Sequence, residues 1–155
     1  MRALYDYEIR KALKKCKSFQ GVYPANHVNL KFTPGGIVIN LDSCTEPGSH
    51  WVSFYVKIKH GVKRGYYFDS FAQNIPEELL PRLKLFADEI KMSSIPVQSN
   101  FSEACGYYAI GFIIAQEAGL SLKEYERMFN VNDAETNDKI IEQQIKCLVD
   151  KKSRT

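Results

Sequence analysis

A cysteine stands near the start of the most apolar stretch of the chain, which runs from residue 100 to residue 115. The residues just before Cys105 are small or polar, and no charged residue follows it before Glu117. This pattern predicts a buried helix with a thiol in its first turn. Because the N-terminus of a helix carries roughly half a positive charge, it favours the thiolate over the thiol. Cys105 is therefore our candidate nucleophile, and the rest of the chain must supply a base.

The base for Cys105 must be one of three histidines. His27 lies in an irregular segment and His60 in a polar turn between lysines, whereas His50 stands at the start of a strand, directly before the single tryptophan. A residue at a strand end faces both a cleft and the core, which suits a catalytic group. We therefore expect His50 to be the base.

Two further residues fit the remaining roles of a thiol hydrolase. Asp69 closes a run of three aromatic residues at the end of the next strand, where its carboxylate can orient the imidazole. Gln98 lies seven residues before Cys105, and its amide can stabilise an oxyanion together with the backbone N–H of Cys105. Each residue also has a structural interpretation: a core thiol, a structural histidine, a turn cap or a partner for backbone groups. Because residues suited to four different catalytic roles all stand at the ends of expected elements, we favour the catalytic interpretation over the structural one.

Four motifs surround these residues: Gly48-Ser49-His50-Trp51, Tyr67-Phe68-Asp69-Ser70-Phe71, Val97-Gln98, and Ser102-Glu103-Ala104-Cys105-Gly106-Tyr107. In this order they resemble the adenovirus-type (adenain-like) cysteine endopeptidases, which belong to the superfamily that includes the SUMO- and ubiquitin-like-specific proteases. The resemblance implies that His50 is the base, Asp69 the orienting acid, Cys105 the nucleophile and Gln98 an oxyanion donor. It also implies substrate-binding roles, with Trp51 shaping the cleft and Gly106 leaving room for the substrate backbone.

The elements that must position these residues predict an α+β fold in one domain, residues 1–155. We expect helices at 2–16, 77–91, 104–118, 121–129 and 134–150, and strands at 37–41, 50–58, 66–71 and 93–98. Residues 19–24 would leave the first helix, and residues 25–36 would be irregular. The expected architecture is a central mixed β-sheet flanked by helices, with the nucleophile at the N-terminus of the central helix. The resemblance adds a papain-like site in permuted chain order.

The composition argues against several other classes of protein. Of the 155 residues, 45% are hydrophobic and 25% charged, as in ordinary globular proteins. No apolar run approaches the roughly 20 residues of a membrane span, and the N-terminus lacks a signal-peptide core, so we expect no membrane association and no secretion. The four cysteines form no CxxC pair, so we expect no metal site and a reducing compartment.

The resemblance implies an endopeptidase that cleaves capsid and core precursor polypeptides of a virus, virophage or DNA transposon during maturation, at sites containing glycine. We expect a monomer that acts in the virion and in the host cytoplasm or nucleus. The sequence requires no cofactor, although an activating peptide or DNA stays open. Residues 45–104 contain no cysteine, which argues against a disulfide-linked peptide, and the basic cluster Lys14-Lys15-Cys16-Lys17 gives some support to DNA.

Three features depart from the adenovirus pattern. Asp69 stands where those proteases often have glutamate, Ala72 replaces a usual glycine, and the chain is shorter. Two alternatives therefore stay open. One is a deubiquitinase or deSUMOylase that uses the same site to cleave after Gly-Gly. The other is a non-catalytic DNA-binding or structural module that keeps the fold.

Overall fold

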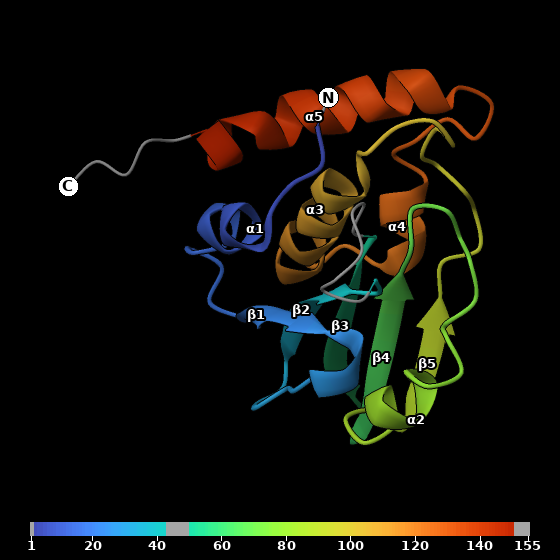
Figure 1. The fold of residues 1–155 in the computed structure, drawn as a ribbon. Helices are drawn as coiled ribbons and strands as arrows, with labels where there is room; N and C mark the ends of the chain where they lie inside the picture. Colours follow the sequence, from blue (N-terminus) through green and yellow to red (C-terminus); the bar gives the residue numbers. More distant parts are fainter. Residues whose placement is uncertain (1, 43–49, 151–155) are drawn as a thin grey trace.

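A five-stranded β-sheet forms the centre of the computed structural model, which describes residues 2–42 and 50–150 (Figure 1). Residues 43–49, which include Gly48 and Ser49 of the first motif, and the C-terminal tail lie outside the described residues. The strands are β1 (Phe19–Pro24), β2 (Gly35–Asn40), β3 (Trp51–Lys59), β4 (Val62–Phe68) and β5 (Glu89–Met92), and they lie side by side in this order. The outer pairs β1–β2 and β4–β5 are parallel, whereas β2–β3 and β3–β4 are antiparallel. The sheet is therefore mixed, as predicted.

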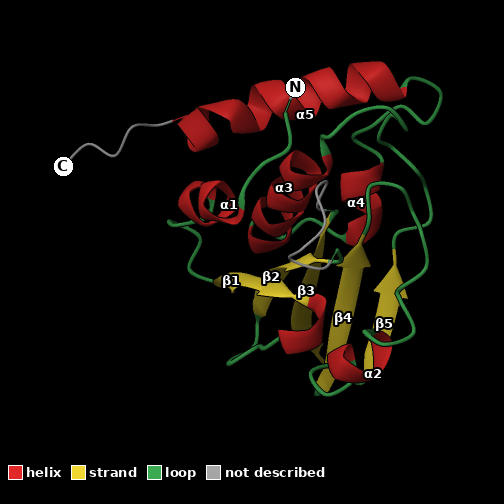
Figure 2. Cartoon of the chain, in the orientation of Figure 1, coloured by secondary structure: helices red, strands yellow, loops and turns green. Residues whose placement is uncertain are grey.

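The helices cover the sheet unequally (Figure 2). They are α1 (Asp6–Ala12), α2 (Leu80–Leu83), α3 (Cys105–Glu117), α4 (Leu122–Glu126) and α5 (Ala134–Asp150), with a short 3₁₀ turn, η1 (Ala25–His27). Helix α3 packs on the sheet between α1 and α4, and α5 runs across α1 and α3 on the side away from the strands. Helix α2 and the loops around it cover the other face. This arrangement confirms the predicted α+β architecture.

Two apolar clusters lie on opposite faces of the sheet because successive side chains of a strand point to opposite sides. On β3, Trp51 and Tyr55 join the cluster under α3, whereas Val52, Phe54 and Val56 join the cluster under α2. Both faces are buried from Trp51 to Val56, which explains why this part of the strand is apolar except for Ser53 rather than alternating. Every residue of α3 from Cys105 to Gln116 is buried except Ile114, so the predicted central helix is held on all sides.

The structure corrects four expectations about local elements. The first helix spans only Asp6–Ala12, and residues 19–24 form β1 beside β2. The helix expected at 77–91 shrinks to Leu80–Leu83, while Glu89–Met92 pairs with β4 as the edge strand. No β-strand forms at residues 93–98. The apolar spacing of Leu79, Leu83 and Ala87 also suits successive turns that pack on a sheet. The following residues, Glu89–Met92, pair with the open edge of β4 instead of continuing the helix.

The C-terminal half follows the predictions closely. Helices α4 and α5 lie where the apolar spacing places them, and the Ser121 hydroxyl accepts a hydrogen bond from the Glu124 amide, as an N-cap does. Among the helices of residues 2–42 and 50–150, none combines the length and apolar character that crossing a membrane requires.

Candidate active site

One cleft, of about 490 Å³, gathers three of the four candidate catalytic residues at one end of the sheet. Its walls come from four places: the N-terminal segment, the ends of β2 and β3, the loop after β4, and the loop before α3. The lining residues are Ala3, Leu41, Asp42, His50, Phe71, Gln73, Gln98, Asn100, Ser102, Glu103 and Cys105. His50, Gln98 and Cys105 therefore share one cavity, and Asp69 lies directly behind it.

The imidazole of His50 is held by the buried carboxylate of Asp69. Nε2 of His50 lies 2.9 Å from Oδ1 of Asp69, and the Asp69 side chain is completely buried. The pairing follows from the sheet, because β3 begins just after His50 and its antiparallel neighbour β4 ends just before Asp69. The backbone amide of Phe71 donates to the same carboxylate oxygen over 2.8 Å. The carboxylate is thus fixed from two sides.

His50 also interacts with Cys105. Burial alone would lower the pKa of His50, but the hydrogen bonds and charges of Asp69 and Cys105 outweigh burial and raise its pKa to about 10. The imidazole thus contacts both the carboxylate and the sulfur, and its raised pKa favours the imidazolium at neutral pH.

Cys105 is the first residue of α3, as predicted, and is 4% exposed. The rest of α3 carries no charged residue before Glu117 and is almost entirely buried, so the thiol stands at the end of a well-packed helix. The partial positive charge at this helix end stabilises negative charge on a group placed there. The position is suited to a nucleophile that must keep its place while a substrate binds.

Gln98 approaches the loop before α3 rather than open solvent. Its Oε1 accepts a hydrogen bond from the Ser70 hydroxyl over 2.5 Å. Its Nε2 donates to the carbonyl oxygen of Ser102 over 3.0 Å and lies 3.2 Å from the Ser102 hydroxyl. The amide is therefore oriented with its N–H groups toward the segment that carries Cys105.

The two expected substrate-binding residues, Trp51 and Gly106, directly follow His50 and Cys105 in the chain, but both are buried. Trp51 is 4% exposed, and its indole N–H donates to the carbonyl oxygen of Leu4 over 3.0 Å. A Cβ atom on Gly106 would meet Leu4 at 3.1 Å and Trp51 at 3.2 Å. The N-terminal segment thus covers both residues, and neither lines the cleft. The physical reason is that Leu4 packs against Trp51 and Gly106, where we expected the substrate to bind.

Three residues that sequence reasoning gave no role help to hold the site. Ser70 orients Gln98, and Phe71 stacks on the His50 ring with centroids 5.2 Å apart. The Ser93 hydroxyl accepts from the Asp69 amide and donates to the Asp69 carbonyl. Ser70 and Phe71 directly follow Asp69 in the quoted motif, and this adjacency could have indicated their roles. Nothing in the sequence around Ser93 indicates its contact with Asp69.

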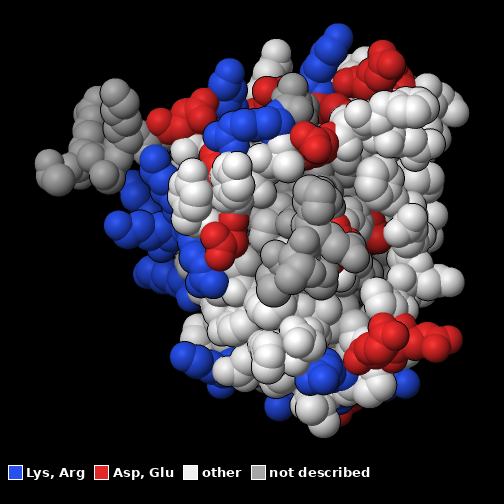
Figure 3. Space-filling model, viewed as in Figure 1, with Lys and Arg blue, Asp and Glu red and all other residues white. Residues whose placement is uncertain are grey.

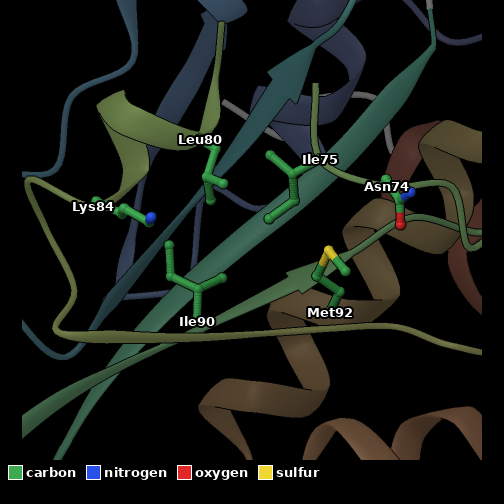
Figure 4. A pocket seen from close by; sticks show the side chains of 6 residues that line it. All are labelled: Asn74, Ile75, Leu80, Lys84, Ile90 and Met92. Atoms are coloured by element: carbon green, nitrogen blue, oxygen red, sulfur yellow. The ribbon is translucent and has the colours of Figure 1, made fainter. Parts of the chain in front are cut away.

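A second hollow, of about 400 Å³, lies between α2 and the edge strand β5 (Figure 4). Its lining is mainly aliphatic: Asn74, Ile75, Leu80, Lys84, Ile90 and Met92. Its lining contains no cysteine, serine, acid or histidine. Across residues 2–42 and 50–150, no three histidine, cysteine or acidic side chains lie close enough together to hold a metal ion.

The fold is shared with solved structures that include a viral protease. The ASFV pS273R protease superposes with a TM-score of 0.59 at 18% identity, over 90% of this chain and 66% of that one; its selenomethionine form gives 0.58 at 16%. An AvrA deletion variant solved with IP6 and CoA gives 0.54 at 16%, over 83% of this chain and 53% of that one. This chain therefore spans just under two thirds of the protease and about half of AvrA. No protein-family model and no curated sequence matches the chain.

These likenesses place the chain in the fold class that the motifs indicated. Their low identity carries no information on individual residues, so the roles of His50, Asp69, Gln98 and Cys105 depend on the geometry of the cleft. The order of these four residues along the chain agrees with the resemblance, while the permuted relation to papain stays a prediction.

Proposed function

We propose that this protein is a cysteine endopeptidase with Cys105 as nucleophile, His50 as general base and acid, and Asp69 as the orienting carboxylate. The observation that carries the proposal is the contact of His50 with both the buried Asp69 carboxylate and the Cys105 thiol in a single cleft. The fold shared with the ASFV pS273R protease supports a proteolytic role for this cleft.

Acylation begins when the Cys105 thiolate attacks the carbonyl carbon of the scissile peptide bond and forms a carbon–sulfur bond. Negative charge moves to the carbonyl oxygen, where the Cys105 amide and the Gln98 side chain stabilise it. The His50 imidazolium then gives its proton to the leaving nitrogen as the carbon–nitrogen bond breaks. An acyl-enzyme thioester and a free amine result.

Deacylation uses the same groups in reverse order. Neutral His50 takes a proton from a water molecule, and the hydroxide attacks the thioester carbon. The carbon–sulfur bond breaks, which releases the carboxylic acid and restores the thiolate beside the imidazolium. Asp69 holds the ring by its Nε2 nitrogen throughout.

The substrate class that we propose is a precursor polypeptide of a virus or a virus-like element, cleaved at a site containing glycine. The viral origin of the ASFV protease and the family resemblance of the motifs support it. A test is to incubate the protein with viral capsid and core precursor polypeptides that contain glycine at the cleavage site. Cys105→Ala should abolish cleavage, and Cys147→Ala, which removes an exposed thiol from α5, should leave it intact. Equal cleavage by Cys105→Ala would refute the proposal.

A ubiquitin or SUMO probe ending in Gly-Gly distinguishes the related deconjugating activity. Deconjugation would use the same three residues, so the geometry of the site does not distinguish it from precursor cleavage. The preferred substrate does. Turnover of the probe in preference to precursor peptides would assign the chain to deconjugation. A protein that neither cleaves nor is labelled at Cys105 by iodoacetamide would be a binding module.

We also propose that DNA increases the activity by binding over α1. Five cations, Arg10, Lys11, Lys14, Lys15 and Lys17, are exposed within eight residues, and no acidic residue lies between Glu8 and Asp42. Lys and Arg side chains gather on this side of the molecule (Figure 3). The K14E/K15E variant should lose salt-dependent DNA binding and any stimulation, yet keep basal cleavage. Stimulation that survives this change would contradict the proposal.

A further inference from the structure

The backbone around Gln98 is held from three directions. The amides of Val97 and Gln98 both donate to the carbonyl oxygen of Ser70, over 2.9 and 3.2 Å, beyond the end of β4. The Val97 carbonyl oxygen in turn accepts from the Tyr108 hydroxyl on α3 over 3.3 Å. Residues 93–98 have no β-partner, so these contacts, rather than a ladder, fix the segment.

The third direction is α5, through two adjacent buried polar residues. Asn137, 1% exposed, donates from Nδ2 to the Val97 carbonyl oxygen over 3.0 Å. Asp138, 5% exposed, accepts from the Tyr108 hydroxyl over 2.8 Å and from the Ser99 amide over 3.4 Å. Helix α5 therefore holds the residues on both sides of Gln98, although it contributes nothing to the lining of the cleft.

Burial of an aspartate is costly unless its oxygens are satisfied, so a core position of this kind needs a reason. A typical helix-packing contact would use the apolar face of α5, which Ile141, Ile145 and Val149 already supply. Asn137 lies one turn before Ile141; it bonds the backbone of Asn130 and also the Val97 carbonyl oxygen beside Gln98. Asp138 accepts from the Tyr108 hydroxyl and from the Ser99 amide on the other side of Gln98. The bonds to Val97 and Ser99 are explained if the position of Gln98 must be held closely.

We propose that Asn137 and Asp138 are positioning residues for the oxyanion donor Gln98, so that α5 controls the reaction without touching the substrate. This inference rests on the proposed function. An oxyanion donor acts only when its N–H lies about 2.7–3.1 Å from the developing charge. The Ser70 hydroxyl fixes which end of the Gln98 side-chain amide faces the loop before α3. The bonds from α5 to Val97 and Ser99 fix the position of the Gln98 backbone.

The test compares Asp138→Ala with Asp138→Asn, which keeps the acceptor Oδ1, and with Glu135→Ala, which removes an exposed carboxylate from the same end of α5. Cleavage of a quenched precursor peptide with glycine at the scissile bond should show kcat about 10-fold lower for Asp138→Ala with KM little changed, since slight misplacement of catalytic groups is costly. Asp138→Asn and Glu135→Ala should stay near the parent. Labelling of Cys105 by iodoacetamide, which needs no oxyanion donor, should be unchanged in all three.

A double mutant separates positioning from general stability. Gln98→Ala alone should lower kcat by roughly 100-fold, and adding Asp138→Ala should cause no further loss, because Asp138 acts through Gln98. Additive losses, or slower labelling of Cys105 in Asp138→Ala, would overturn the inference. If Gln98→Ala itself left kcat unchanged, the proposed oxyanion role would fail, which is a different result.

Hydrogen–deuterium exchange gives a readout that needs no substrate. Asp138→Ala should speed exchange of the amides at residues 97–99 while the amides inside α3 keep their protection, because only the tether is lost. Unchanged exchange at 97–99 would overturn the inference even if no cleavable substrate had been found.

Discussion

The ring of Phe71 lies stacked on the imidazole of His50, with the planes 26° apart, while the Phe71 amide bonds the same Asp69 oxygen that holds His50. One residue thus restrains both members of the pair. Phe71→Leu removes the aromatic face and should lower kcat/KM by about 10-fold, because the imidazole can rotate away from the sulfur. Phe71→Tyr keeps the stack and is the matched control. Steady-state kinetics on a precursor peptide would show the difference, and equal rates for Phe71→Leu and the parent would argue against restraint by stacking.

The raised pKa of His50 predicts an alkaline limit to activity. The imidazolium persists through neutral pH and is lost as the pH rises through about 10, after which no proton is available for the leaving amine. Folding raises this pKa from its ordinary value of 6.5, so the stability it contributes is fully present below pH 6.5 and is lost on rising to about 10. A pH profile of kcat/KM should therefore fall near pH 10.

Asp69→Asn provides the control for this profile. It removes the charge that raises the pKa, so the alkaline limit should move down toward 6.5, with NMR titration of the His50 ring following it. A limit that stays near 10 in Asp69→Asn would mean that another group titrates.

Trp51→Phe should affect stability more than catalysis, because the indole N–H bonds Leu4 and the ring does not line the cleft. Loss of one buried hydrogen bond predicts a decrease of about 1 kcal/mol in the free energy of unfolding. Leu4→Ala, which empties the cover over Trp51 and Gly106, should cost about 2–5 kcal/mol. Urea unfolding measures both. A large rise in KM for Trp51→Phe with unchanged stability would restore the expected role in substrate binding.

Gly111→Ala should destabilise the packing of α3. The added Cβ would come within 2.5 Å of the Tyr125 hydroxyl and 2.9 Å of Ile141, and that hydroxyl donates to the Tyr108 carbonyl oxygen. Overpacking of this kind costs about 1–3 kcal/mol. Gly61→Asn is the control, since its position has a positive φ that asparagine tolerates and no neighbour within 4 Å. Thermal unfolding should show a clear fall for Gly111→Ala only.

The central helix and the pairing of His50 with Asp69 could be predicted from local sequence. A long apolar run behind Cys105 predicts a buried helix, and a tight hairpin fixes which residues of β3 and β4 are neighbours. Gln98 could be placed in the cleft by its motif, but its hydrogen bonds to Ser70 and Ser102 could not, because they depend on how two loops meet.

The contacts of α5 and of the N-terminal segment could not be predicted from the sequence for a related reason. Leu4 meets Trp51 across 47 residues, and Asn137 meets Val97 across 40. A single sequence gives periodicity within an element but no register between distant elements. The same limit explains β5, since the spacing of Leu83 and Ala87 fits a helix until the open edge of β4 is known.

The order of the strands has a consequence for protein synthesis. All five strands lie in sequence order between Phe19 and Met92, and Cys105 follows the last of them. The ribosome therefore completes the residues of all five strands, with His50 and Asp69, before it adds Cys105. Because synthesis runs from the N-terminus at about 5–20 residues per second, the nascent polypeptide lacks the nucleophile of the candidate site until Cys105 leaves the exit tunnel.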